Sequence, residues 1–469
     1  MKILTELKEI IGKKNVLLGD NIGNYRSDWT GKYRSNPLAV IKPGSTEEVS
    51  KVTKLCYNNN ISMVPVSGNT GLSGGTSADN SVIISLERMN KIKEIKKSAR
   101  VAIVESGVIL SKLHDVVDDV DLIFPLTFGA KSSAMIGGVL STNAGGSNVL
   151  KYGNTRSLCL GLEVVLPDGK IMNLMSELHK DNTGYDLKDL IIGAEGTLGI
   201  ITAAVLKLSP KPIAYATAMI ATNTLQKALK VLNILQEQTD GGVEAFEYMP
   251  KNYIETHLSK IPNARPPFEK NYEVNIMLEI GTAAPKNGGR LPNGSNKLYT
   301  DLEDVLSNML SSGDILDAVI AQSESQRIEM WERREASAEI TITDEPLIIT
   351  DVAVPIDQVS VFMKKMDNIL QKIDPGSRSL TVAHLGDGNI HYAIYPTKAD
   401  ESLFDKLNNE LEEVTQELGG SFSAEHGVGL SKKNSMQRRK NPVALDVMRV
   451  IKIGLDPKNL MNPGKVLPN

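Results

Sequence analysis

The chain has 469 residues, of which 41% are hydrophobic and 23% are charged, and its formal net charge is −4. These values predict a soluble globular protein with two or three domains. The slight negative charge argues against binding to nucleic acid or to a membrane surface, and the short basic runs at 432–433 and 438–440 are more typical of a solvated helix face.

The sequence also lacks the usual signals of export and membrane insertion. No apolar run approaches the roughly 18 residues that a transmembrane helix needs. The first ten residues mix acids and bases at helical spacing without an apolar core, so we do not expect them to act as a signal peptide. Two cysteines, Cys56 and Cys159, are too few for a disulfide framework. We therefore expect a reducing compartment: the bacterial cytoplasm or, as an alternative, an organelle matrix.

The first elements along the chain predict a βαβ unit. Apolar residues at helical spacing in 3–11 indicate an amphipathic helix, and a polar loop follows. Leu38–Ile41 is a predicted strand, and Ser45 with Glu48 three residues later has the spacing of a capping box at a helix start. Ile61–Val66 is the next predicted strand.

Three glycine-rich stretches follow, at 67–76, 137–146 and 193–199. The first joins the strand Ile61–Val66 to another predicted strand, Val82–Leu86, so it is neither a Rossmann fingerprint nor a P-loop, which both lead into a helix. Glycine still lets backbone N–H groups approach a pyrophosphate closely. Each stretch alone is more typical of a tight turn, but three of them together favour phosphate binding.

Pro210-Lys211-Pro212 marks a predicted domain boundary. Beyond it glycines become sparse, and the patterns of a helix at Leu225–Gln236 and a strand at Asn275–Ile280 predict a second, α+β domain. Ala283–Ser295, rich in Pro, Gly and Asn, is a predicted surface loop. From Ser421 onward the chain returns to Gly- and Pro-bearing motifs, which indicates that the tail rejoins the first domain.

Two histidines flank a predicted hairpin turn at Asp387-Gly388. Centring the turn on these two residues pairs His384 directly with His391, with Cβ atoms about 5 Å apart on one face of the sheet. Two imidazoles in this arrangement favour a shared metal ion. The alternative is an ordinary cross-strand pair without a metal.

The motif Ser423–Gly429 offers a third candidate ligand, Glu425, beside His426. Two histidines and one glutamate form a ligand set that leaves an open position on a catalytic metal. His426 is then a candidate general base, because an imidazole titrates near neutral pH. Whether Glu425 approaches the hairpin depends on the tertiary structure.

Arg333 and Arg334 lie among glutamates in a predicted helix. An arginine can hold a substrate carboxylate through a two-pronged hydrogen bond. In isolation, however, this pattern favours a solvated ion-pair face.

Six motifs, in this order, resemble those of the FAD-dependent D-2-hydroxy-acid dehydrogenases: PVSGNTGLSGGT, IGGVLSTNAGG, GAEGTLGIIT, HLGDGNIH, SAEHGVG and MNPGKVLP. That family includes D-lactate dehydrogenase, the flavin subunit of glycolate oxidase and D-2-hydroxyglutarate dehydrogenase. The resemblance implies the α+β fold of the vanillyl-alcohol oxidase (PCMH) type. Its bipartite FAD-binding domain, of two α/β subdomains, would span residues 1–211, a substrate- and metal-binding cap domain 212–420, and a segment completing the FAD domain 421–469.

The resemblance also implies roles for individual residues. The FAD diphosphate would be held by Gly68, Asn69, Thr70 and Gly71, and the flavin would be lined by Pro125, Ser133, Gly138, Asn143, Gly146, Gly199 and Ile201, with Asn462 and Lys465 closing over the site. His384, His391 and Glu425 would bind the metal (Zn, Mn or Fe). His426 would act as base and Arg334 would engage the substrate carboxylate. FAD would be non-covalent, since no motif cysteine or histidine suggests attachment.

The implied reaction is oxidation of a D-2-hydroxy acid to the 2-oxo acid, with metal-assisted hydride transfer from C2 to flavin N5. Three positions depart from the hydroxyglutarate enzymes, which have lysine, threonine and asparagine where this chain has Ile349, Ala338 and Ala393. A second substrate carboxylate would lack partners there. We therefore favour D-lactate or a substrate with an apolar side chain, and D-2-hydroxyglutarate is the alternative.

Two further alternatives keep the flavin and change the role. One is a non-redox FAD alkyl transferase, and the other is a non-catalytic flavin subunit for electron transfer. For a dehydrogenase the electron acceptor would be a quinone, a cytochrome, an electron-transfer flavoprotein or oxygen, which the sequence does not distinguish. The oligomeric state is also open, with a homodimer as one option.

Overall fold

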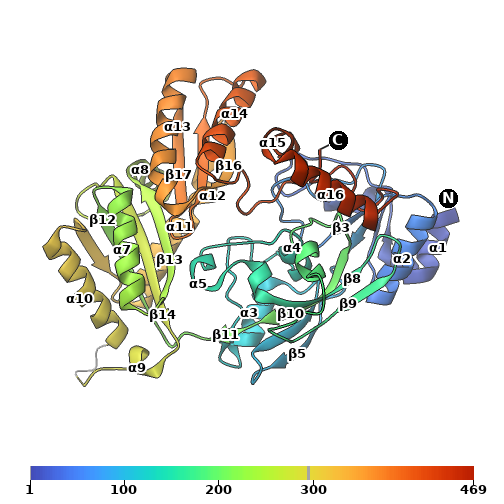
Figure 1. Ribbon diagram of the computed structural model, residues 1–469, viewed down its shortest axis with the longest axis horizontal. Coiled ribbons are helices and arrows are strands. Elements are labelled where there is room, and N and C mark those ends of the chain that lie inside the picture. Colours follow the sequence, from blue (N-terminus) through green and yellow to red (C-terminus); the bar gives the residue numbers. More distant parts are fainter. Residues whose placement is uncertain (1, 293–295, 469) are drawn as a thin grey trace. The chain divides into compact units, whose positions relative to one another are not determined.

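The computed structural model describes residues 2–292 and 296–468 and divides the chain into two compact units. Unit 1 comprises Met1–Gly146, Gly153–Pro210 and Glu425–Asn469, and unit 2 comprises Ser147–Tyr152 and Lys211–Ala424 (Figure 1). Within the described residues, no helix is long and apolar enough to cross a membrane.

The first sheet of unit 1 has the strand order β1-β2-β4-β3, and β2, β4 and β3 are parallel. Helix α2 links β2 to β3, which confirms the predicted βαβ unit. Ser45 Oγ accepts a hydrogen bond from the Glu48 N–H (3.2 Å), and Glu48 reaches back to the Gly44 N–H (2.7 Å). The elements are α1 (Lys2–Ile11), β1 (Val16–Leu17), β2 (Ala39–Ile41), α2 (Thr46–Asn58), β3 (Met63–Val66) and β4 (Val82–Ser85).

The second sheet of unit 1 is antiparallel, with the order β5-β6-β10-β8-β9. Its strands are β5 (Ile92–Lys96), β6 (Val101–Glu105), β8 (Cys159–Val165), β9 (Ile171–Leu174) and β10 (Ile200–Lys207). Strands β7 (Leu122–Ile123) and β11 (Ser209–Pro210) form a separate two-stranded pair, and β7 contacts helix α3 (Leu110–Asp118). Helix α4 (Ile136–Ser141) contacts β6 and β10 of the second sheet, and α6 (Leu187–Ile191) precedes β10 in the chain.

The C-terminal segment from Glu425 onward belongs to unit 1. Helices α15 (Lys433–Arg439) and α16 (Pro442–Leu455) lead to a tail that runs parallel to β3. The Met63 N–H donates to Leu460 O and the Asn462 N–H donates to Met63 O, both at 2.7 Å. Asn462 is thereby held among the glycine-rich loops.

Unit 2 is built on a seven-stranded antiparallel sheet with the order β15-β12-β14-β13-β17-β18-β16. Its strands are β12 (Ala214–Thr222), β13 (Val243–Pro250), β14 (Val274–Thr282), β15 (Asp317–Ile320), β16 (Ile348–Ala353), β17 (Arg378–His384) and β18 (Asn389–Tyr395). The segment 147–152, with α5 (Val149–Tyr152), packs on this unit through a Lys151–Glu244 ion pair at 2.8 Å.

The two faces of this sheet carry different side chains. One face packs against α7 (Leu225–Gln238), α10 (Lys297–Ser312), α13 (Val359–Ile373) and α14 (Glu401–Glu417) in a large apolar core. The other face contacts α8 (Lys251–Lys260), α11 (Glu324–Glu335) and α12 (Ser337–Thr341) and mixes apolar with charged side chains.

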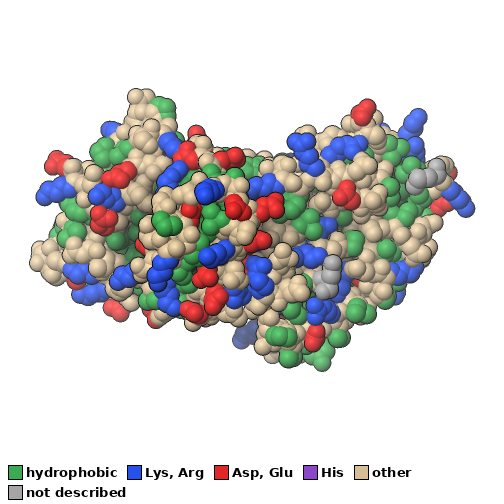
Figure 2. Space-filling model, turned by 90° about the horizontal axis from the view of Figure 1, so that it is seen from above, with side chains coloured by type: hydrophobic (Ala, Val, Ile, Leu, Met, Phe, Trp, Pro, Cys, Tyr) green, Lys and Arg blue, Asp and Glu red, His purple; other side chains and the backbone are tan. Residues whose placement is uncertain are grey.

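The predicted loop 283–295 contains the short helix α9 (Pro285–Gly288), and its last three residues lie outside the described part. Figure 2 shows basic and acidic side chains interspersed over one side of the molecule.

Candidate active site

The histidine hairpin forms, but its register differs from the prediction. His384 pairs with Asn389 and Val382 pairs with His391, so the loop has four residues, 385–388, instead of two. The Asp387 and Gly388 N–H groups both donate to His384 O, and Asn389 N–H donates to the Asp387 side chain, which stabilises the longer loop. The direct His384–His391 pairing was therefore wrong.

The two imidazoles nevertheless lie on the same face of the sheet. The register differs from the prediction by two residues, and side chains alternate with a period of two, so both rings keep their face. Their centroids are 5.3 Å apart, with the ring planes at 79°. The hairpin brings His384 and His391 together as diagonal neighbours.

Each histidine also lies opposite a carboxylate on the neighbouring strand. Glu247 on β13 pairs with His384, and Asp351 on β16 pairs with His391. Glu247 Oε1 lies 2.9 Å from His384 Nδ1. The four residues form a row across β13, β17, β18 and β16, with Glu247 and Asp351 exposed by 1% and 0%. Sequence reasoning missed both carboxylates, because strand pairing between distant segments leaves no local pattern.

Arg334 lies beside this row instead of on a solvated face. Its Nε donates to Glu247 Oε2 at 2.7 Å, its Nη2 lies 3.4 Å from His384 Nε2, and its Nη1 donates to Ser337 Oγ at 3.2 Å. Arg333 is buried too and donates to Arg265 O. The expectation of a solvated ion-pair face, drawn from the isolated pattern, was wrong, because the helix turns these arginines inward.

The pKa of the Glu247 carboxyl lies below its ordinary value. Burial alone would raise the pKa, but electrostatic interactions and hydrogen bonds with the neighbouring His384 and Arg334 outweigh it. Glu247 is therefore a carboxylate that accepts from two partners. The row as a whole is a fixed array of donors and acceptors in a buried setting.

The Glu425 motif enters from the end of β16. Ser421 exchanges backbone hydrogen bonds with Ala353, and the Ala424 N–H donates to Asp351 O at 3.2 Å. Glu425 and His426 follow directly in the chain. Asp351, His391, Glu425 and His426 each offer one ligand atom, and these atoms lie within 4.8 Å of one another. Mixed imidazole and carboxylate donors of this kind suit a divalent transition metal.

Two residues of the glycine-rich loops of unit 1 form hydrogen bonds with the loop that carries His426. Glu195 accepts the N–H groups of Val428 (2.7 Å) and Gly429 (2.8 Å), and Ser73 Oγ donates to His426 O (2.9 Å). Burial raises the pKa of Glu195, while the two backbone N–H groups lower it. Glu195 lies in the motif GAEGTLG, yet its role was not predicted, because the motif indicated only backbone contacts.

Several of the residues predicted for the cofactor lie where segments of unit 1 approach one another closely. Side chains at three of the glycines would come close to neighbouring segments. A Cβ on Gly68 would lie 2.3 Å from Ser133 O, and one on Gly146 would lie 2.1 Å from Thr127 O. A Cβ on Gly138 would lie 3.4 Å from the Ser67 side chain. Asn69 donates to Ser27 O and Asn143 accepts from Arg156 N–H. Pro125 is buried, Thr70 is half-buried, and Gly199 and Ile201 lie at the start of β10.

Three features of these loops fit an anionic cofactor. Gly71 has open space where a side chain would be. Asn462 Nδ2 donates to Gly75 O and Glu195 O, while its buried Oδ1 has no partner among the described residues. The Lys465 ammonium donates to the carbonyl oxygens of Ser77 (2.7 Å) and Pro463 (3.2 Å). A bound FAD would supply an acceptor for the amine and a donor for the amide oxygen.

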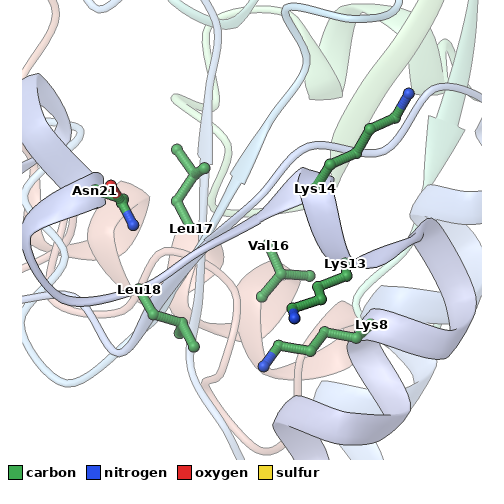
Figure 3. Close-up of a pocket in the computed structure, with 7 residues that line it drawn as sticks. All are labelled: Lys8, Lys13, Lys14, Val16, Leu17, Leu18 and Asn21. Atoms are coloured by element: carbon green, nitrogen blue, oxygen red, sulfur yellow. The ribbon is translucent and has the colours of Figure 1, made fainter.

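A surface pocket elsewhere in unit 1 has different chemistry. It is lined by Lys8 of α1 and by residues of the following segment: Lys13, Lys14, Val16, Leu17, Leu18 and Asn21 (Figure 3). These residues include no imidazole, thiol or carboxylate. Its titratable side chains are lysine amines alone, so the candidate functional residues remain the histidine row of unit 2 and the glycine-rich loops of unit 1.

Comparison with known proteins identifies the family. Residues 37–175 match the model of an FAD binding domain, and residues 211–466 match that of the C-terminal domain of FAD linked oxidases. The D-2-hydroxyglutarate dehydrogenase of Stutzerimonas stutzeri is 32% identical over 99% of this chain and 98% of its own length. The mitochondrial D-2-hydroxyglutarate dehydrogenase of Arabidopsis thaliana is 33% identical over 100% and 82%.

Solved structures agree on the fold. p-Cresol methylhydroxylase matches with a TM-score of 0.73 at 16% identity, over 99% of this chain and 96% of that one. The 4-ethylphenol oxidase of Gulosibacter chungangensis matches with 0.72 at 18%, over 100% and 97%. The predicted PCMH-type fold and FAD-binding domain are confirmed. The chain belongs to the FAD-linked D-2-hydroxy-acid dehydrogenases.

Proposed function

We propose that this dehydrogenase oxidises a D-2-hydroxy acid with a short or apolar side chain, such as D-lactate, and uses a divalent metal (Zn, Mn or Fe) besides FAD. The observation that carries the proposal is Arg334 Nη2 at 3.4 Å from His384 Nε2. A 2-hydroxy acid has its carboxylate next to its hydroxyl. The guanidinium can bind the carboxylate, while a metal held by the neighbouring imidazole can bind the hydroxyl.

The chain's own residues then have distinct tasks. His384, His391 and Glu425 hold the metal, and Arg334 binds and orients the substrate carboxylate. His426 accepts the hydroxyl proton. When bound, the metal polarises the hydroxyl and FAD accepts the hydride from C2 at flavin N5.

The side-chain preference comes from three apolar positions in unit 2. Ile349 lies directly opposite Ala393 on β16 and β18, one pair along the same face from Asp351 and His391. Ala338 lies on α12, four residues after Arg334. A second carboxylate at this place would lose water without gaining a charged partner, which costs several kcal/mol in order of magnitude.

An anaerobic titration of the flavin absorbance with D- and L-2-hydroxy acids tests this proposal. We expect D-lactate to bleach the oxidised flavin band, L-lactate to have little effect, and prior chelation to abolish the bleaching. D-2-hydroxyglutarate is expected to react more slowly than D-lactate at equal concentration. The reverse order would contradict the apolar preference and would favour the activity that the relatives' names carry.

A matched variant strengthens this test. Ile349→Lys, Ala338→Thr and Ala393→Asn together restore the polar groups of the hydroxyglutarate enzymes, and we expect them to shift kcat/KM toward D-2-hydroxyglutarate by about tenfold or more, since a charge-assisted hydrogen bond contributes roughly 1.5–3 kcal/mol. A flavin that no hydroxy acid bleaches would favour the non-redox alternative. Alkyldihydroxyacetonephosphate synthase shares the fold at 17% identity, with a TM-score of 0.73 over 99% of this chain and 86% of that one.

Gly71→Ala tests the diphosphate loop. A Cβ at Gly71 meets no protein atom within 4 Å, so the variant is expected to fold with unchanged Tm as apoprotein. The FAD dissociation constant is expected to rise about tenfold or more, because the methyl group prevents the close approach of the main chain to the pyrophosphate. Gly454→Ala, also in open space but on α16, is the control. Equal FAD affinity in the two variants would place the diphosphate elsewhere.

Lys465 predicts a pH dependence of FAD binding. Burial, with repulsion from Lys433, lowers the pKa of the Lys465 amine from 10.5 to about 8. The charged amine favours an anionic diphosphate, so FAD affinity is expected to fall as pH rises above about 8. The apoprotein itself is expected to gain stability from pH 8 toward 10.5, because the unfolded chain keeps the proton that the folded chain has lost.

Fluorescence titration with FAD between pH 7 and 10 measures this effect. Lys465→Met is expected to bind FAD more weakly at pH 7 and to lose most of the pH dependence. An unchanged pH dependence in Lys465→Met would show that another group titrates.

A further inference from the structure

We propose that Glu247 is a positioning residue that sets two binding groups at once: the imidazole of His384 and the guanidinium of Arg334. The inference rests on the proposed function, in which His384 binds the metal and Arg334 binds the substrate carboxylate. Each carboxylate oxygen of Glu247 contacts one of these groups. Oε1 lies 2.9 Å from His384 Nδ1, and Oε2 accepts a hydrogen bond from Arg334 Nε at 2.7 Å.

These contacts select one tautomer of His384. An arginine can only donate, so Arg334 Nη2 at 3.4 Å from Nε2 requires a lone pair on Nε2. The proton then resides on Nδ1 and is donated to Glu247 Oε1. A carboxylate that accepts from one imidazole nitrogen keeps the other nitrogen unprotonated, the form that can bind a metal, and fixes the ring orientation.

Glutamine cannot replace this carboxylate. Both partners of Glu247 are donors, His384 Nδ1–H and Arg334 Nε–H, whereas a glutamine amide has a single acceptor oxygen and presents N–H groups at the other position. With Glu247 1% exposed, water does not compensate for the mismatch. Glu247→Gln therefore retains the size of the side chain and removes one of the two anchors.

Asp351 provides an internal comparison. It lies opposite His391, as Glu247 lies opposite His384, and accepts from Asn389 Nδ2 at 2.9 Å. The hydrogen bonds of Arg334 go to Glu247, His384 and Ser337, so Arg334 is held from the Glu247 side of the row. Asp351→Asn is thus expected to perturb the metal ligands without loosening Arg334, so the two variants separate the two tasks.

Glu279 provides a matched control for folding. It is 3% exposed on β14, on the same face of the sheet, and pairs with Arg327 through two hydrogen bonds of 2.6 and 2.7 Å. Glu279→Gln removes a buried carboxylate–arginine pair of the same kind on β14, a strand that pairs with neither β17 nor β18. Any general cost of losing such a pair appears in this control as well.

The test measures metal affinity by chelator competition in wild type, Glu247→Gln, Asp351→Asn and Glu279→Gln, and KM for the hydroxy acid at saturating metal. We expect Glu247→Gln to weaken metal binding about 10–100-fold and to raise KM about tenfold or more through the loosened arginine. Asp351→Asn is expected to weaken metal binding with KM nearly unchanged. Glu279→Gln is expected to match wild type in both.

The outcomes separate this inference from the proposed function. A wild-type protein that binds no metal contradicts the proposed metal site itself. A wild type that binds metal, with Glu247→Gln equal to it in metal affinity and KM, overturns only the role of Glu247. Equal losses in Glu247→Gln and Glu279→Gln would assign the effect to folding and overturn it too.

If Glu247→Gln does not fold, the tautomer of His384 can be measured in the wild-type protein instead. The sequence has six histidines, so ¹⁵N-histidine labelling gives few signals, and His384→Gln assigns the one of interest. In metal-free protein we expect His384 to be the Nδ1–H tautomer. An Nε2–H tautomer would overturn the inference without any change at Glu247.

Discussion

Replacing His391 with asparagine is expected to remove the bound metal and to lower kcat about a thousandfold. The ring is half-buried, lies opposite Asp351, and its centroid is 5.3 Å from that of the His384 ring. A metal ion stabilises developing charge by several kcal/mol, and each 1.4 kcal/mol or so corresponds to a factor of ten in rate. Metal analysis and steady-state kinetics on the same preparation measure both effects.

His179→Asn is the control for this variant, since His179 is exposed and lies outside the motifs. FAD content is expected to stay at the wild-type level in both variants, because the cofactor loops belong to unit 1 and His391 to unit 2. Retention of metal and activity by His391→Asn would contradict the proposed ligand set.

His426→Asn is expected to lower kcat by about 10²–10⁴ while the metal stays bound, the usual range for removing a general base. The loop position is maintained by contacts that the substitution leaves intact: Glu195 holds the Val428 and Gly429 N–H groups, and Ser73 holds His426 O. Loss of rate is therefore expected to reflect the missing imidazole and not a displaced loop.

Metal analysis of this variant also distinguishes two ligand sets. The proposal uses His384, His391 and Glu425, whereas the candidate ligand atoms that cluster within 4.8 Å come from Asp351, His391, Glu425 and His426. If His426 is a base, His426→Asn keeps the metal and His384→Asn loses it. The reverse result would make His426 a ligand and would require another proton acceptor.

The sequence was informative wherever a short segment determines its own conformation. The capping box at Ser45 and Glu48 formed because both partners lie within one helical turn. The βαβ unit followed from strand and helix patterns that each occupy a few residues. The two imidazoles stayed on one face despite the wrong register, since the side-chain period of a strand tolerates a shift of two residues.

The sequence by itself thus determined the family, the presence of an FAD-binding domain and the placement of both histidines on one face of the sheet. Tertiary structure alone decided the partners of those histidines. Glu247 is 137 residues and Arg334 is 50 residues from His384 in the chain, so no local sequence pattern could predict either contact. The physical reason is that strand pairing and helix packing join distant segments, while periodicity and capping describe only neighbours along the chain.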